Sequence, residues 1–284
     1  MAEIMTMSSD PKLIAQVLCE APTTTAHLDP GLRRALARRI AAHAPARELG
    51  PIRLDSYVIT TVLRGGALHR DGPFHWSPRA ARRIIGGGAL RHLLEGRAKD
   101  PLSGVQCEIT ALVNQAAGRR DQRSGSLGQW LHEAPPSLRV AVAAEAMTYA
   151  TELLTCVDLT SLCASIDASA ADPQWAVPGA PWISVRGRRD LEVAFNGTHG
   201  HRAILALRGG PMGPDARYDL GIVALTAALS RPDAPLPARI VGIWGATGRA
   251  MVVPVDGETM KTAARQVLQA VEALGVPTRA KLAA

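Results

Sequence analysis

The chain has 284 residues, of which 47% are apolar, and a formal net charge of +7 at pH 7. This length and apolar content are enough for a full hydrophobic core, and they exclude a largely disordered chain. The longest apolar run, residues 220–229, is about half the roughly 20 residues that a membrane span needs. The N-terminus lacks a basic segment followed by an apolar one, so we expect a cytoplasmic protein with no secretory signal.

Basic residues are concentrated in one quarter of the chain. Residues 31–100 hold 13 Arg and 1 Lys against 5 acidic residues, a balance of +9, whereas the rest of the chain sums to −2. Arginine supplies 28 of the 32 basic residues, a bias typical of a GC-rich genome. A one-sided excess of arginine favours binding to phosphate backbones, and the alternative is a solvated basic face.

Cysteine and aromatic residues indicate no site of their own. The four cysteines include no Cys-x-x-Cys pair, which argues against a zinc ribbon or an iron–sulfur cluster. Aromatic residues make up 4% of the chain, too few for a base-stacking platform of the kind that binds single strands. The five tryptophans are dispersed, and we expect them in the core or at an interface.

The N-terminal part of the chain reads mainly as helix. Residues 1–50 are expected to form a helical extension, with one helix over residues 32–44 where apolar positions recur at helical spacing. Residues 52–63 are rich in β-branched side chains and fit a strand or a helix equally.

The next predicted helix begins at Ser77-Pro78 and runs to residue 96. Its three consecutive glycines, 86–88, indicate a close approach by another backbone or a ligand, or else a break in the helix. Residues 101–136 are expected to be rich in loops, and Pro135-Pro136 to open a long helix over residues 137–154.

The C-terminal third has the most informative pattern. Residues 183–195 predict one strand with an apolar face and with Asp190 and Glu192 on the opposite face. The elements expected after it are a turn (196–200), a strand (203–207), a Gly/Pro loop (209–214), a helix (near 220–227), two strands (238–244 and 250–255) and a closing helix (256–275). The order β-β-α-β-β-α predicts an α/β fold with helices packed on a central sheet.

Several short motifs in this part of the chain, taken in order, resemble those of RecB-type nucleases of the PD-(D/E)XK superfamily. The Gly-x-x-Asp strand motif of that family is similar to residues 187–190, and its apolar-(Asp/Glu)-apolar-Lys-x-Gly strand to residues 205–210. The start of its next helix is similar to Tyr218-Asp219-Leu220, and an upstream Gly-x-x-x-His helix to residues 88–95.

The resemblance covers most of residues 52–274 and implies a PD-(D/E)XK-like fold, a central mixed sheet flanked by helices. The domain implied covers residues 51–284, with its nuclease-like core at about 183–274, preceded by the helical extension of residues 1–50.

In that family, two carboxylates on neighbouring strands hold Mg²⁺, which activates a water molecule at the scissile phosphate, and a lysine beside them stabilises the phosphate. Asp190 supplies the first carboxylate here, but Ala206 stands at the second and Arg208 at the lysine. A methyl group cannot bind a metal, and a guanidinium with a pKa above about 12 cannot act as a base. The sequence therefore predicts a degenerate nuclease-like protein that binds DNA without cleaving it and needs no cofactor.

The residues expected at this site form three groups. Asp190, Arg208 and His92 are the candidates for a vestigial catalytic site, and Asp190, Glu192 and Asp219 are the candidate ligands of Mg²⁺ or Mn²⁺ if the protein is active. The candidate phosphate contacts are Arg82, Arg83, Arg91, Arg188, Arg189 and Arg208.

Two other classes of function remain open at this point. One is an active Mg²⁺-dependent nuclease in which Glu192 replaces the missing carboxylate, although a surface residue on a half-exposed strand is the plainer interpretation. The other is a protein-interaction module, which predicts an exposed apolar patch. The plainer interpretations of Asp190 and His92 are an ion pair with Arg188 or Arg189 and a buried core histidine.

Overall fold

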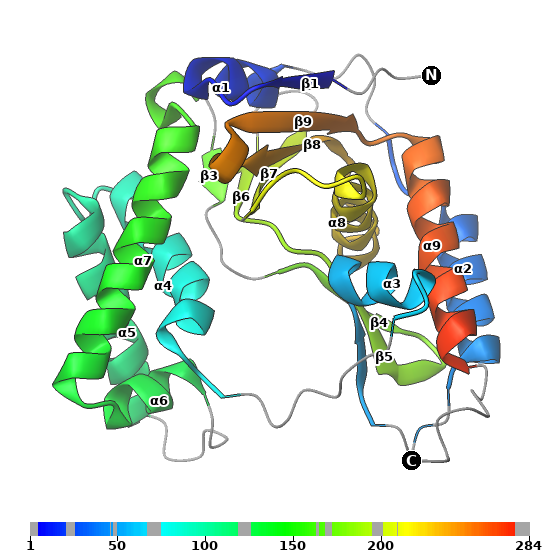
Figure 1. The fold of residues 1–284 in the computed structure, drawn as a ribbon, viewed down its shortest axis with the longest axis horizontal. Coiled ribbons are helices and arrows are strands. Elements are labelled where there is room, and N and C mark those ends of the chain that lie inside the picture. The colour runs from blue at the N-terminus through cyan, green and yellow to red at the C-terminus, as the bar shows by residue number, and fades with distance from the viewer. Residues whose placement is uncertain are drawn as a thin grey trace.

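The structure, a computed structural model, describes residues 5–20, 26–45, 47, 50–66, 75–118, 126–162, 165–167, 172–194, 201–208 and 210–275. These residues form a mixed α/β fold with two sheets and with helices on both sides of the larger one (Figure 1).

The larger sheet has the strand order β1-β9-β8-β7-β6-β3. Its strands are β1 (Met5–Ser8), β3 (Ser165–Asp167), β6 (Leu191–Ala194), β7 (Arg202–Arg208), β8 (Pro237–Trp244) and β9 (Arg249–Pro254). Strands β7 and β8 are parallel, and the other neighbouring pairs are antiparallel. The smaller sheet comprises β2 (Ile52–Leu54), β5 (Ala180–Arg186) and β4 (Gln174–Val177), with β2 parallel to β5 and β4 antiparallel to it.

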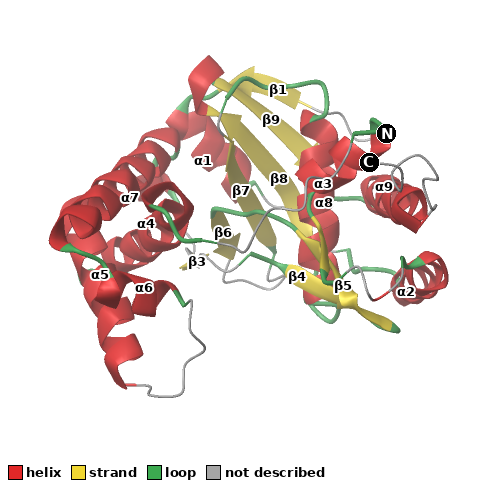
Figure 2. Ribbon diagram, turned by 60° about the horizontal axis from the view of Figure 1, so that its bottom comes forward, coloured by secondary structure: helices red, strands yellow, loops and turns green. Residues whose placement is uncertain are grey.

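The helices form two groups on opposite faces of the larger sheet (Figure 2). One group consists of α1 (Pro11–Cys19), α4 (Pro78–Leu94), α5 (Pro101–Gly118), α6 (Leu127–Glu133) and α7 (Pro136–Cys156). The other consists of α2 (Pro30–His43), α3 (Ser56–Leu63), α8 (Ala216–Ser230) and α9 (Gly257–Gly275). Two short 3₁₀ helices, η2 (Leu159–Ser161) and η3 (Gly245–Thr247), complete the described elements.

Strand β7 lies in the centre of this arrangement and contributes to two hydrophobic cores. Leu205 and Leu207 pack into the core shared with α1, α4 and α7, whereas Ile204 and Ala206 belong to the core that contains α8 and α9. Successive side chains of a strand point to opposite faces, so a strand covered on both faces needs a continuous apolar run. The run Ala-Ile-Leu-Ala-Leu at residues 203–207 meets this need.

Helix α4 is continuous through the three consecutive glycines, and these glycines allow neighbouring helices to approach it closely. A Cβ on Gly86 would lie 2.6 Å from a ring carbon of Tyr149 and 3.0 Å from the carbonyl oxygen of Ala146, both on α7. A Cβ on Gly88 would overlap the carboxyl group of Glu108 on α5. The expected close approach is therefore confirmed, and the expected helix break is wrong.

Two predicted elements upstream of the site differ from the observed ones. Residues 52–63, which fitted a strand or a helix, contain both: β2 ends at Leu54, and Asp55 caps α3 by accepting a hydrogen bond from the Val58 N–H at 2.8 Å. Residues 101–136, expected to be loop-rich, are largely helical in their described part, which holds α5 and α6. Residues 1–50 contribute the edge strand β1 to the larger sheet in addition to α1 and α2.

The single strand predicted over residues 183–195 is two strands in two different sheets. Strand β5 ends at Arg186 in the smaller sheet, and β6 begins at Leu191 in the larger one. The four residues between them, 187–190, cross from one sheet to the other, and Gly187 passes α8 so closely that a Cβ would lie 3.0 Å from the Cα of Val223. The crossing places Asp190 at the start of β6 rather than on the face of a long strand.

Within the described residues, the helices are too short or too polar to cross a membrane.

Candidate functional site

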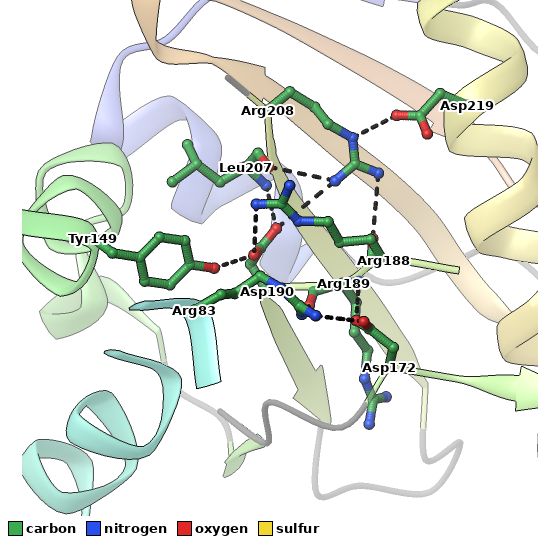
Figure 3. Close-up of polar contacts among 9 residues, drawn as sticks. All are labelled: Arg83, Tyr149, Asp172, Arg188, Arg189, Asp190, Leu207, Arg208 and Asp219. Carbon is green, nitrogen blue, oxygen red and sulfur yellow. Dashed lines mark hydrogen bonds and ion pairs between the residues drawn. The ribbon is translucent and has the colours of Figure 1, made fainter. Parts of the chain in front are cut away.

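A cluster of charged side chains lies where β7 ends and α8 begins (Figure 3). We call it the Asp190 cluster; its members are Arg83, Tyr149, Asp172, Arg188, Asp190, Arg208 and Asp219. Strands β7 and β8 are parallel and are connected through α8, so the carboxyl end of β7 and the first turn of α8 meet at this edge of the sheet. In α/β proteins this is the edge at which ligands usually bind.

The Asp190 carboxylate is fully buried and its oxygens are already occupied by donors. Oδ2 accepts a hydrogen bond from the Leu207 N–H at 2.7 Å, and Oδ1 accepts one from the Tyr149 hydroxyl. The Asp190 N–H donates to the carbonyl of Leu205 at 3.0 Å. Strand β6 begins only at Leu191, so it offers no backbone partner to the Leu207 N–H of β7. The Asp190 carboxylate accepts the hydrogen bond from this N–H instead. Asp190 therefore closes the end of the β6–β7 ladder.

Two arginines balance the charge of Asp190. Arg188 and Arg208 place guanidinium nitrogens 3.8 and 3.9 Å from its carboxylate oxygens. Burial raises the pKa of the Tyr149 hydroxyl, and the negative charge of Asp190 raises it further, so Tyr149 stays protonated and donates. The predicted ion pair with Arg188 is thus present.

Arg208, at the position of the family's lysine, joins the strand to the helix. Its Nε donates to Asp219 Oδ2 at 2.5 Å, and its Nη2 donates to the carbonyl of Arg188 at 3.3 Å. The guanidinium therefore lies between the carboxylates of Asp190 and Asp219. Since it has no lone pair to accept a proton, its role here is to hold the two carboxylates in place.

Ala206, at the position of the family's second carboxylate, is completely buried. It belongs to the core that contains α8, and its register partner on β8 is Gly242. A Cβ on Gly242 would lie only 2.8 Å from a methyl carbon of Leu220 on α8, so the helix packs tightly against this face of the sheet. The packing leaves an apolar environment where a metal-binding carboxylate would have to lie.

Glu192, the proposed replacement ligand, belongs to a second cluster with three arginines. Its side chain is 1% exposed, and its carboxylate forms ion pairs with Arg189, with Arg202 at 2.7 Å and with Arg231 at 3.0 Å. Burial lowers the pKa of Arg202, and the positive charge of Arg231 lowers it further. The interpretation of Glu192 as a surface residue on a half-exposed strand is therefore wrong: the residue neutralises buried arginines.

The three predicted metal ligands do not fit a Mg²⁺ site. Asp190, Glu192 and Asp219 each direct carboxylate oxygens at arginine side chains, and Asp190 in addition receives an N–H and a hydroxyl. A divalent cation needs oxygen lone pairs that are free of such donors. In the described part of the chain, no three His, Cys, Asp or Glu side chains come together as a candidate metal site.

His92 is buried in the helical group and is not brought to the Asp190 cluster. Its Nε2 lies 3.1 Å from Glu108 Oε2, which also accepts a hydrogen bond from Arg91 at 3.1 Å. The residue lies nine positions beyond Arg83 on α4, which is about 13 Å along the helix axis. The plainer interpretation, a buried core histidine, agrees with this placement, with Nε2 paired to Glu108 and Nδ1 buried without a hydrogen-bond partner among the described residues.

All six arginines predicted to bind phosphate have a carboxylate partner. The pairs are Arg82–Glu145, Arg83–Asp172, Arg91–Glu108, Arg188–Asp190, Arg189–Glu192 and Arg208–Asp219. The pairs of Arg83, Arg189 and Arg208 are the more buried ones, and these arginines must give up a strong interaction before they can bind a phosphate, so they are poor candidates for the main contacts.

A groove beside the Asp190 cluster contains two arginines that sequence reasoning missed. We call it the α4–β5 groove; it has a volume of about 480 Å³ and is lined by Arg53, Trp76, Ala80, Arg83, Ile84, Asp172, Gln174 and Arg186. Arg53 lies opposite Ser184 in the parallel β2–β5 pair, and Arg186 is two residues further along β5, so both side chains lie on the same face of the smaller sheet. Arg83, whose pKa is raised by Asp172 although burial alone lowers it, connects the groove to the cluster.

The charges of Arg53 and Arg186 are poorly compensated. Burial lowers the pKa of Arg186, and the positive charge of Arg53 lowers it further, against a smaller opposing effect of Asp172 and Asp55. Arg186 donates from Nη2 to the amide oxygen of Gln174 at 2.8 Å, a neutral partner. The excess charge of residues 31–100 included Arg53, but nothing in the sequence pointed to Arg186.

Comparisons of this chain with protein-family models, with curated proteins and with solved structures gave no match.

Proposed function

We propose that this protein binds the phosphate backbone of DNA and does not cleave it, with a PD-(D/E)XK-like fold whose metal site has become a structural ion-pair cluster. The observation that carries the proposal is the α4–β5 groove, in which Arg53 and Arg186 lie close together in a hollow and repel each other. Binding of an anion between them relieves that repulsion, and a phosphate group matches the hydrogen-bonding geometry of a guanidinium.

The charge balance of the groove supports an anionic ligand. Arg83 is paired with Asp172 through hydrogen bonds from Nη1 and Nη2, so that pair is neutral. Arg53 and Arg186 then leave the groove with an excess of positive charge, which Asp55 only partly offsets. Lysine and arginine side chains that neutralise phosphates supply most of the affinity of sequence-independent DNA binding.

Three features of the Asp190 cluster support binding without cleavage. Each oxygen of Asp190 already accepts a hydrogen bond and the carboxylate faces two arginines, Ala206 offers no ligand, and Arg208 cannot accept a proton from water. Each of these residues instead has a structural role: Asp190 caps a strand, Ala206 packs in the core, and Arg208 connects β7 to α8.

Replacing Arg53 and Arg186 together with glutamine should weaken DNA binding on the order of tenfold or more and reduce its salt dependence. The slope of log K against log salt should become shallower by about 0.9 for duplex DNA, because the two guanidiniums share one phosphate and each neutralised phosphate contributes about 0.9. Fluorescence anisotropy of a labelled oligonucleotide, titrated at several salt concentrations, measures both quantities.

The matched control for this experiment is the double variant Arg249→Gln/Arg265→Gln. Both residues are exposed, on β9 and α9, and the two double variants lose the same net charge. We expect the control to bind nearly as well as the wild type. Equal weakening by the two double variants would show that only the overall charge matters, and a flat salt dependence of the wild type would exclude the proposed function.

A further inference from the structure

One wall of the α4–β5 groove is aromatic. Trp76 lies two residues before the first residue of α4 and lines the groove together with Ala80 and Ile84. It is half-buried, in contrast to Trp175 and Trp244, which are each 4% exposed and belong to the hydrophobic core. Trp76 is therefore partly held by its neighbours, while the rest of its side chain lines the α4–β5 groove.

The orientation of the Trp76 ring is set by a second tryptophan. Trp130 on α6 lies with its ring centroid 6.5 Å from that of Trp76, at an interplanar angle of 35°. Tilted aromatic pairs at this separation are attractive. Because Trp130 already restrains the Trp76 ring, the ring loses little conformational freedom when another flat group stacks on it. The Trp76 ring is therefore well suited to bind such a group.

The groove presents the groups that one nucleotide needs. The guanidiniums of Arg53 and Arg186 match a phosphate, the ring of Trp76 matches the flat face of a base, and Gln174 and Asp172 offer polar groups between them. Its volume of about 480 Å³ lies in the range of small-ligand sites. In a duplex the faces of the bases are covered by their neighbours, so a ring inside a hollow can stack only on an unpaired base.

We infer that the α4–β5 groove holds an unpaired nucleotide of single-stranded DNA, with the base stacked on Trp76 and the adjoining phosphate between Arg53 and Arg186. The inference rests on the proposed function and adds the form of DNA that is bound. It predicts that the protein prefers single strands over duplexes and that this preference comes from the base rather than from the backbone.

The test compares three probes of equal length with the full chain: a thymine oligonucleotide, the same backbone with abasic residues, and a duplex. We expect the wild type to bind the thymine strand on the order of ten- to a hundredfold more tightly than the abasic strand, as stacking of a base on an aromatic ring provides. The Trp76→Ala variant should lose this difference while its binding to the abasic strand and its salt slope stay unchanged.

Two further variants separate stacking from a loss of folding. Trp76→Tyr should retain most of the preference for the thymine strand, since the ring remains, and it should remove most of the fluorescence quenching that the wild type shows on binding. Tyr57→Ala changes an aromatic side chain that is 75% exposed on α3, outside the groove, and should leave all three affinities unchanged.

The outcomes distinguish this inference from the proposed function. Equal affinity of the wild type for the thymine and abasic strands, with a steep salt slope, would overturn base stacking and leave DNA binding in place. The same would follow if Trp76→Ala weakened binding to both strands equally. No binding of any of the three probes would overturn the proposed function and this inference together.

Discussion

Replacing Glu192 with glutamine should lower the free energy of unfolding by about 3–5 kcal/mol, the usual effect of removing one partner from a buried ion pair. The carboxylate is 1% exposed and is shared by Arg189, Arg202 and Arg231. Glutamine keeps the shape of the side chain but removes the negative charge that the three guanidiniums share. Arg189 and Arg202 are affected most, because their side chains are only 6% and 8% exposed and cannot move to water.

Equilibrium unfolding in urea measures this effect, and Glu258→Gln is the matched control. Glu258 carries the same side chain on α9, is 80% exposed and is paired only with the exposed Lys261 among the interactions described. Its replacement should change the free energy of unfolding by less than about 0.5 kcal/mol. If Glu192→Gln were equally neutral, the carboxylate would not be needed by its arginines, and its interpretation as a spare metal ligand would regain support.

Restoring the family's acidic residue through Ala206→Asp should destabilise the protein by more than about 4 kcal/mol and should not create nuclease activity. Ala206 is fully buried in an apolar core, opposite Gly242, where α8 packs closely on the sheet. A carboxylate placed there loses its hydration and gains no hydrogen-bond donor in return. Ala206 is therefore part of the packing of the core, and we expect that a single substitution cannot introduce a metal-binding carboxylate there.

The same substitution at an exposed position, Ala246→Asp, is the control. Ala246 lies in η3 between β8 and β9, and we expect a change of less than about 0.5 kcal/mol there. Thermal unfolding and a nuclease assay with Mg²⁺ on both variants provide the comparison. A stable Ala206→Asp protein that cuts DNA would contradict the structural roles assigned to Ala206 and Asp190.

Regular apolar patterns were sufficient to predict most of the C-terminal elements. Strands over residues 203–207, 238–244 and 250–255 were expected within one or two residues of β7, β8 and β9, because each has a β-branched or aliphatic run bounded by turn residues. The helix expected near residues 220–227 is α8, and the pairing of Arg208 with Asp219 follows from the strand–helix order.

The sequence could not show that Asp190 and Glu192 are buried. Alternation of apolar and charged residues is typical of a strand with one face in water. Here the charged residues face the interior, because Arg202 on the neighbouring strand β7 satisfies Glu192, while Tyr149 and Arg231 come from more distant parts of the chain. The change of sheet between β5 and β6 was missed because one strand was predicted across residues 187–190, although Gly187 and Arg189 stand where the alternation requires apolar side chains.

The α4–β5 groove was missed because it depends on a long-range pairing. Strand β2 pairs with β5, and this register places Arg53 beside Arg186 although more than 130 positions separate them in the sequence. The excess of arginine in residues 31–100 predicted a basic surface. It could not show that Arg82, Arg83 and Arg91 of this segment have carboxylate partners, nor that Arg53 lies in a groove with Arg186.

The central claim is that this fold binds DNA and leaves it intact, and the most direct test examines both properties in one sample. Wild-type protein is incubated with labelled single-stranded and linear duplex DNA in Mg²⁺ or Mn²⁺, and the products are analysed on native and denaturing gels beside the Asp190→Asn variant. We expect a salt-sensitive shift on the native gel and DNA of unchanged length on the denaturing gel. Metal-dependent cleavage that disappears in Asp190→Asn would contradict the claim and would make Asp190 a metal ligand.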